Sequence, residues 1–250
     1  MSSNRTDNAK VNSLVKILPP QPARICWIPN SGNQVALDVC KKIFDACDGS
    51  NRRILLVDGV GGSGLSYLLL AFERSLRRNG NRVLTLLEGV VEDEGSLLSN
   101  LTAAVGVPFS VKRSREISDI LASVLKLRRI DAVIIHDFQR FTSIEGRQSC
   151  ANLDALLYLL ALMPKCKFIL GGTSSSLELV GLLMAAHIVE RVSLQSMDYD
   201  QNFISFVDHL AALYANDLNG RKVDAKAIHA ITGGLVGETA IQVRLMVSHA

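Results

Sequence analysis

The stretch DGVGGSGLS, from Asp58 to Ser66, decides how the rest of the sequence is interpreted. It follows the apolar run ILLV at residues 54–57 and precedes a helical pattern at residues 65–80. A strand, a glycine-rich turn and a helix in this order are typical of a phosphate-binding loop. In such a loop, successive backbone N–H groups converge on an anion where the helix begins. The stretch therefore predicts an anion site.

The glycines and the hydroxyl of this loop fit a nucleotide site, but the residue at the position of the usual lysine does not. Leu65 occupies the place where such loops carry lysine for the β and γ phosphates, whereas Ser66 can bind Mg²⁺. We expect either a backbone cradle that binds ATP and Mg²⁺ more weakly, or a glycine-rich turn without a ligand. The candidate cofactor-binding residues are Gly59, Val60, Gly61, Gly62, Ser63, Gly64, Leu65 and Ser66.

Strand and helix patterns alternate five times through the middle of the sequence, and helical patterns alone follow. The strand patterns are apolar along their length, which favours a parallel sheet covered on both faces. The strands are expected at residues 53–58, 82–89, 131–137, 167–173 and 188–194. The helices are expected at residues 35–47, 65–80, 95–107, 118–128, 151–163, 177–186, 199–214, 224–231 and 237–246.

The sequence therefore predicts an α/β P-loop NTPase fold with a five-stranded parallel sheet and helices on both faces. We expect residues 1–22, which are polar and then proline-rich, to form a flexible N-terminal arm. Residues 23–197 are expected to form the α/β domain, and residues 198–250 a small helical lid domain.

The end of the third predicted strand, AVIIHDF, carries the candidate catalytic and metal-binding carboxylate Asp137. P-loop ATPases of the additional-strand type place an aspartate for Mg²⁺ there, followed by a glutamate that orients water. In one register His136 takes the metal aspartate's place and Asp137 the glutamate's. In the other, Asp137 serves the metal and Phe138 stands at the base position. Either register supplies one carboxylate where two are needed, and neutral imidazole is a poor Mg²⁺ ligand. His136 is otherwise expected to be buried and bonded to a neighbouring loop.

Thr173, at the end of the fourth strand, is the other candidate catalytic residue, because it can reach a γ-phosphate or the attacking water. Alternatively, Thr173 begins the next helix as an N-cap, a role that Ser175 or Ser176 can also fill. An arginine from a neighbouring subunit completes such ATPase sites, and Arg191 and Arg147 are the nearby candidates.

Composition limits the class of protein. Hydrophobic residues make up 48% of the 250 residues and charged residues 20%, which suits a globular protein with a large core. The five cysteines form no CxxC pair, which argues against a zinc site and a disulfide framework. Neither a signal peptide nor a membrane span is predicted, so we expect a cytoplasmic location and no membrane partner.

The net charge of +3 permits contact with nucleic acid without requiring it. Basic residues gather in three clusters, and such clusters can contact phosphates, although arginines on a solvated helix face are the commoner explanation. The aromatic content is 5%, which favours duplex DNA over a single strand. The clusters are Arg74, Arg77, Arg78 and Arg82; Lys112, Arg113 and Arg115; and Lys126, Arg128 and Arg129.

Taken together, these motifs resemble the TniB family of AAA+ transposition proteins, which are relatives of the TnsC regulators. The resemblance runs from RICWIP at residues 24–29, through GVGGSGLS, AVGVP, VIIHDF and GGT, to GGLVGETA at residues 233–240. Active members of the family carry lysine in the loop and an Asp-Glu pair on the third strand. This sequence departs at Leu65 and at His136-Asp137, so we predict impaired hydrolysis.

The resemblance implies an ATP-dependent oligomer on double-stranded DNA that links a target-selection protein to a DDE transposase. Three hypotheses follow. The first is a regulator or adaptor with weak or structural nucleotide binding. The second is an active DNA-stimulated ATPase in which Arg52, Arg53 or a neighbour's arginine replaces the missing lysine. The third is an interaction platform that binds no nucleotide. Whether the chain is an enzyme stays open among them.

Overall fold

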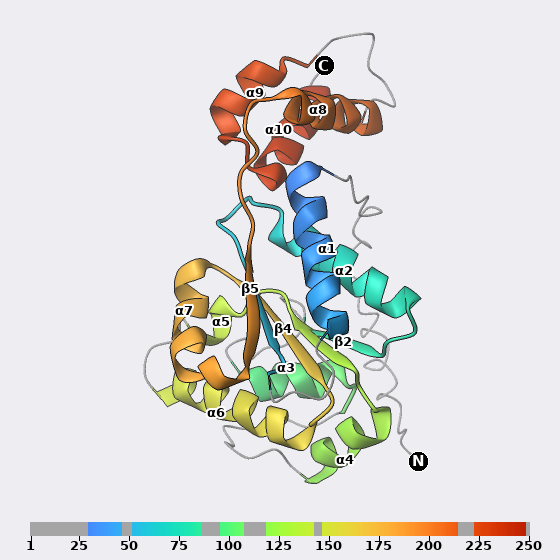
Figure 1. Ribbon diagram of the computed structural model, residues 1–250, viewed down its shortest axis with the longest axis vertical. Coiled ribbons are helices and arrows are strands. Elements are labelled where there is room, and N and C mark those ends of the chain that lie inside the picture. The colour runs from blue at the N-terminus through green and yellow to red at the C-terminus, as the bar shows by residue number, and fades with distance from the viewer. Residues whose placement is uncertain are drawn as a thin grey trace, which may run out of the picture.

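The computed structural model describes residues 30–46, 52–86, 96–107, 119–142, 147–214 and 223–248. The N-terminal arm, the RICWIP segment and the second basic cluster lie outside these residues. The predicted fold class is confirmed: five parallel strands form one sheet in the order β2-β3-β4-β1-β5, with helices on both faces (Figure 1). The strands are β1 (Ile54–Asp58), β2 (Val83–Leu86), β3 (Ala132–Ile135), β4 (Lys167–Gly172) and β5 (Ile188–Ser193).

The central strands are buried because they pack against helices on both sides. Successive residues of a strand point to opposite faces, so Leu56 packs with one group of helices and Leu55 and Val57 with the other. The first face is covered by α3 (Leu97–Ala104), α4 (Asp119–Arg128), α5 (Gln139–Thr142), α6 (Arg147–Leu162) and α7 (Ser174–Leu183). The second face is covered by α1 (Ser31–Ala46) and α2 (Leu65–Arg78).

The strand register brings the ends of β1, β3 and β4 together. Asp58 of β1 pairs with Gly172 of β4, and Ile135 of β3 pairs with Leu170. The carboxyl ends of these parallel strands therefore lie at one edge of the sheet, where ligands bind in open α/β folds. β5 is an edge strand, and its outer residues are largely exposed.

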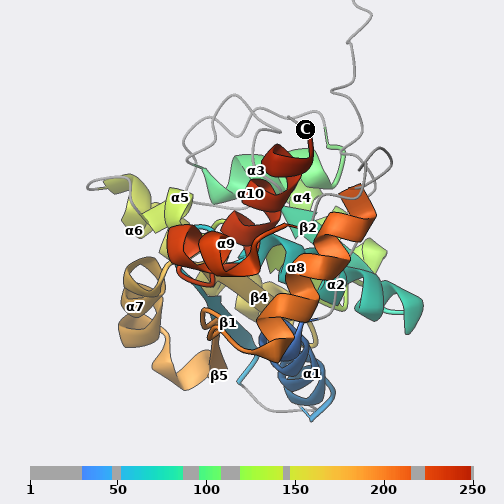
Figure 2. The ribbon, with the colours of Figure 1, turned by 90° about the horizontal axis from the view of Figure 1, so that it is seen from above.

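Three helices follow β5 and form a unit that we call the lid. These are α8 (Gln201–Tyr214), α9 (Ala225–Thr232) and α10 (Val236–Ser248), and they pack around a separate apolar cluster that includes Phe203 and Val243. The lid lies at one end of the molecule, and the view from that end shows it over the sheet (Figures 1 and 2).

Several predicted boundaries differ from the structure. The helix expected at residues 177–186 begins at Ser174, because the preceding Thr173 already has the extended backbone of a helix N-cap. The helix expected at residues 151–163 begins at Arg147. The short helix α5 and the 3₁₀ turn η1 (Ala185–His187) were not predicted. No described helix is long and apolar enough to cross a membrane.

Candidate functional site

The loop between β1 and α2 has the backbone shape that its glycines predict. Gly62 and Gly64 adopt left-handed φ angles of 78° and 87°, which residues with a side chain rarely adopt. The N–H of Ser63 donates to the carbonyl of Val60 at 3.0 Å, and the N–H of Gly59 donates to Gly172 of β4 at 3.2 Å. These bonds hold the loop at the carboxyl edge of the sheet, where α2 begins at Leu65.

The side chain of Leu65 is apolar where a lysine would place a charge. It is half-buried, it packs against the core cluster under α1 and α2, and it also lines the cleft described below. Ser66 follows in the first turn of α2 and is exposed at the same cleft. The loop therefore offers backbone amides and a hydroxyl, without the positive charge of a complete phosphate-binding loop.

His136 and Asp137 follow β3 directly, and both line the same cleft as the loop. His136 is 7% exposed, as expected of a buried histidine, and its Nε2 has no hydrogen-bond partner in the described part of the chain. Burial, together with the positive charge of Arg140, lowers the pKa of His136 to about 4. The imidazole is therefore neutral at physiological pH, and Asp137 is the one carboxylate at this strand end.

Thr173 lines the cleft at the end of β4, as expected of a residue that could approach a phosphate. It is also the N-cap residue of α7, but its side chain makes no capping hydrogen bond and instead lies 3.3 Å from the hydroxyl of Ser175. Thr173 therefore occupies the N-cap position of α7, but its hydroxyl does not cap the helix. The hydroxyl can instead contact a ligand in the cleft.

A buried carboxylate below the loop was missed by sequence reasoning. Asp58 is 3% exposed, and it accepts hydrogen bonds from Arg191 Nε (2.8 Å) and from the hydroxyls of Ser193 (2.8 Å) and Ser174. Burial alone would raise the pKa of Asp58, but the bonds from Arg191, Ser174 and Ser193 outweigh it and lower that pKa. Asp58 thus fastens edge strand β5 and helix α7 to the base of the loop. Arg191, a candidate for an arginine acting on a neighbouring subunit, is bonded within its own chain.

The first turn of α10 docks on the loop. The carbonyl of Gly62 accepts hydrogen bonds from the N–H groups of Gly237 (2.7 Å) and Glu238 (3.2 Å). The Glu238 side chain covers Gly62 so closely that a Cβ atom on Gly62 would lie 2.4 Å from Glu238 Cγ and 2.7 Å from its Oε1. A carboxylate is therefore held beside the loop in which phosphates would bind.

The loop, the strand ends and the lid enclose a cleft of about 400 Å³. Its described lining contains Asp137 and Glu238 as carboxylates and Arg244 of α10 as a cation, which leaves a net formal charge of −1 because His136 is neutral. Sequence reasoning missed Glu238, Arg244 and Tyr214 of α8 as members of this site. The buried Ser63 Oγ, which also has no partner among the described residues, lies in the same lining.

The arginines considered as substitutes for the missing lysine lie at the other end of β1. Arg53 donates to the carbonyls of Leu160 and Met163 at 2.6 Å each, near the end of α6. Arg52 and Arg53 precede β1, whereas the loop follows it, so a whole strand separates them from the cleft. Neither can reach the loop in this fold, and Arg244 is the cation that the structure brings to the cleft instead.

The residues present fit a nucleotide better than they fit Mg²⁺. The glycine cradle and the unpaired buried Ser63 Oγ suit a phosphate group. Mg²⁺ prefers oxygen ligands, and the strand end supplies only Asp137 beside a neutral imidazole. Among the described residues, no three His, Cys, Asp or Glu side chains gather as a metal site.

Comparison with solved structures gives the fold. No protein-family model and no curated protein matches the sequence. The chain is similar to Orc1 of Aeropyrum pernix in complex with DNA (TM-score 0.65, 15% identity), covering 92% of this chain and 63% of Orc1. It is also similar to AMPPCP-bound DnaA of Aquifex aeolicus, with a TM-score of 0.57 and 18% identity. This match covers 88% of this chain and 63% of DnaA. A Walker-type ATPase of Pyrococcus abyssi matches with TM-score 0.53 at 16% identity, covering 88% and 70%.

The chain therefore has an α/β P-loop NTPase fold, which it shares with these solved structures. It spans 63% of the length of the first two structures that it matches.

Proposed function

We propose that this chain is a TniB-like AAA+ regulator or adaptor subunit of DNA transposition. In this role it binds nucleotide weakly or as a structural element, and it hydrolyses ATP poorly. Its partners are double-stranded DNA, a DDE transposase and a target-selection protein, and it acts as a homo- or hetero-oligomer. The motif order from the loop to the lid supports this assignment, as does a fold shared with an Orc1 in complex with DNA.

The observation that carries the proposal is the charge of the cleft. A nucleoside triphosphate carries several negative charges. The described lining of this cleft contains one cation, Arg244, and two carboxylates, Asp137 and Glu238, so its net charge does not favour an anion. The backbone cradle still attracts an anion, because amide groups at a helix N-terminus do not depend on lysine. Turnover would need a metal-binding carboxylate and a second group that orients water, and the residues directly after β3 supply one carboxylate, Asp137.

When bound, ATP with Mg²⁺ would supply a reactive γ-phosphoryl group, and Ser66 and Asp137 are the residues that would hold the metal. The loop amides from Gly59 to Ser66 would bind and orient the phosphates. Thr173, which lines the cleft, would be the remaining polar contact for the γ-phosphate. In this proposal the nucleotide sets the position of the lid and the subunit interface.

The test is a titration of the full chain with a fluorescent ATP analogue, with Mg²⁺ and with EDTA, alongside phosphate release with duplex DNA. We expect weak saturable binding that Mg²⁺ changes little, and no phosphate release above that of Ser66→Ala. DNA-stimulated release that is lost in Ser66→Ala would contradict the proposal and support the active ATPase. The absence of binding in both conditions would support the interaction platform.

A further inference from the structure

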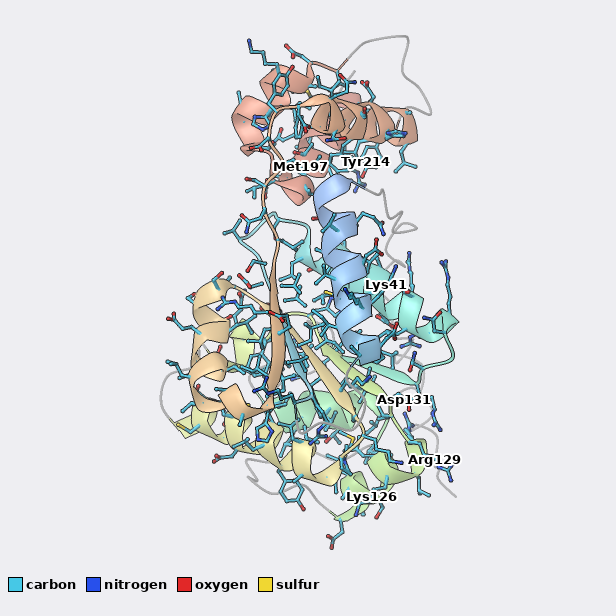
Figure 3. All side chains as sticks on the ribbon, in the orientation of Figure 1. Lys41, Lys126, Arg129, Asp131, Met197 and Tyr214 are labelled. Carbon is cyan, nitrogen blue, oxygen red and sulfur yellow. The ribbon has the colours of Figure 1, made fainter. Side chains whose placement is uncertain are left out.

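Two of the three basic clusters approach each other at the edge of the sheet where β2 and β3 begin. Arg82 and Asp131 join them: the N–H of Asp131 donates to the carbonyl of Arg82 at 2.9 Å, and the N–H of Arg82 donates to Asp131 Oδ2 at 2.8 Å. The end of α2 and the end of α4 therefore flank the start of β2 and β3. Lys126, Arg129 and Asp131 lie at this end, and Met197 and Tyr214 lie at the other (Figure 3).

We call the combined set the basic end surface. All seven of its cations are exposed, and two acids, Glu73 and Asp131, pair with Arg77 (2.8 Å) and Arg82 (3.4 Å). These seven cations and two acids sum to a formal charge of +5. The cations are Arg74, Arg77, Arg78, Arg82, Lys126, Arg128 and Arg129.

The ordinary preference for cations at helix ends explains part of this surface. Arg77, Arg78, Lys126 and Arg128 lie in the last turns of α2 and α4, where the helix dipole stabilises positive charge. Arg129 is different, because it follows α4 with a φ angle of 47° and is the one described residue other than glycine with positive φ. Glycine or asparagine is preferred at such a helix end. Arg129 therefore adopts a backbone conformation that is unfavourable for a residue with a side chain, and its charged side chain is exposed at the surface.

We propose that the basic end surface binds the phosphate backbone of duplex DNA. Exposed arginines and lysines spread over two helix ends match a regular line of phosphates, which is the main source of protein–DNA affinity. The two helices offer no exposed aromatic side chain at this surface for stacking on single-stranded bases: α4 contains none, Phe72 of α2 is buried, and the exposed Tyr67 lies at the start of α2, in the cleft lining. The surface lies opposite the cleft, so DNA and nucleotide do not compete for the same groups.

The inference rests on the DNA partner of the proposed function, and its test separates the two. Binding of the full chain to a short labelled duplex is measured by fluorescence anisotropy between about 50 and 200 mM NaCl. The variant Arg78→Gln/Lys126→Gln/Arg128→Gln removes three charges from the basic end surface. The control Lys226→Gln, on α9 of the lid, is compared with Lys126→Gln alone, so that each removes one charge and both have the same net charge. Circular dichroism melting checks that all three variants remain folded.

We expect the surface variant to lose at least tenfold in affinity and to flatten the plot of log K against log salt. The slope should fall by about 0.9 for each lost phosphate contact, or about 2.7 in all, and the control should keep the wild-type slope. Equal losses in Lys126→Gln and Lys226→Gln, or an unchanged slope in the triple surface variant, would overturn the inference while leaving the DNA partner in place. Wild-type protein that binds no duplex would overturn both. Tighter binding to a single strand of the same length would overturn the duplex assignment.

Discussion

Gly62 and Gly237 join the phosphate-binding loop to the lid through a 2.7 Å hydrogen bond from the N–H of Gly237 to the carbonyl of Gly62. The approach is close enough that a Cβ atom on Gly237 would lie 2.8 Å from that oxygen and 3.3 Å from the backbone nitrogen of Gly64. The neighbouring backbone cannot move aside as a flexible side chain would. The position of α10 is therefore set by the shape of the loop.

The first prediction concerns this contact. Gly237→Ala should shift α10 away from the loop and destabilise the protein by about 1–3 kcal/mol, as overpacking usually does. Hydrogen exchange at the amides of Glu238 and Thr239 should become faster, and urea unfolding gives the free energy. Gly181→Ala in α7 is the matched control, because a Cβ atom there meets nothing within 4 Å. Equal behaviour of the two variants would show that the contact does not hold the lid.

The second prediction concerns the charge that Glu238 places beside the loop. Glu238→Gln keeps the side-chain size and removes a negative charge from the phosphate site, so nucleotide should bind about fivefold more tightly. Isothermal titration with ATP measures the change, and Glu178→Gln, an exposed position on α7 outside the cleft lining, is the control. If binding instead weakens with Mg²⁺ but not with EDTA, Glu238 helps to hold the metal, and the prediction is wrong.

The third prediction concerns the missing lysine. Leu65→Lys places an ammonium group at the start of α2, and a hydrogen bond to a charged group contributes about 1.5–3 kcal/mol. ATP affinity should therefore rise at least tenfold. Leu65→Met is the control, because it keeps an apolar side chain of similar volume. No gain from lysine would mean that the phosphate charge is already balanced by another residue.

Arg244 is the described residue that can provide that balance, and it gives the fourth prediction. Arg244→Gln should weaken nucleotide binding severalfold, because the variant leaves the cleft lining with carboxylates and no cation. Lys226→Gln on α9 removes the same charge outside the lining and should leave the affinity unchanged. The two titrations are compared at the same salt concentration. Loss of equal size in both variants would attribute the effect to net charge.

The fifth prediction is a pH dependence caused by His136. Its pKa is lowered from 6.5 to about 4 in the folded protein, so unfolding takes up a proton between these values. The stability from the neutral ring is fully present above pH 6.5 and is lost as the pH falls towards 4. The loss is at most roughly 3 kcal/mol. His136→Asn should reduce the difference in urea stability between neutral and acidic pH. His209→Asn on the exposed face of α8 should not, and an unchanged difference in His136→Asn would contradict the prediction.

The sheet was predictable because its strands are short apolar runs with turns or helices between them. Ile54 to Val57 is a run of this kind, and all five expected strands were found. The short helix α5 was missed because Gln139–Thr142 is too short to show a helical period. The start of α7 was placed too late, because the serines from Ser174 onward are polar and carry no apolar signal. Ser174 has a partner in Asp58 instead.

The site was only partly predictable. The loop, His136, Asp137 and Thr173 could be found because each follows a predicted strand, and parallel strands end at one edge of a sheet. Glu238 and Arg244 could not be found this way, since they lie on a helix of the lid far along the sequence. Nothing in a helical pattern says which earlier loop the helix will contact. The one local signal was Gly237 itself, because a residue without a side chain allows close approach to a neighbouring backbone.

The linker between β5 and the lid adds a last consequence. The N–H of Leu194 donates to the carbonyl of Asp58 at 2.7 Å, and the N–H of Met197 donates to the carbonyl of Gly234 at 2.9 Å. Together with the bond from Gly237 to Gly62, these contacts connect β1, the linker, the lid and the loop in a ring of backbone hydrogen bonds. We therefore expect a ligand that changes the shape of the loop to move the lid as well, so that the position of the lid depends on whether the loop is occupied.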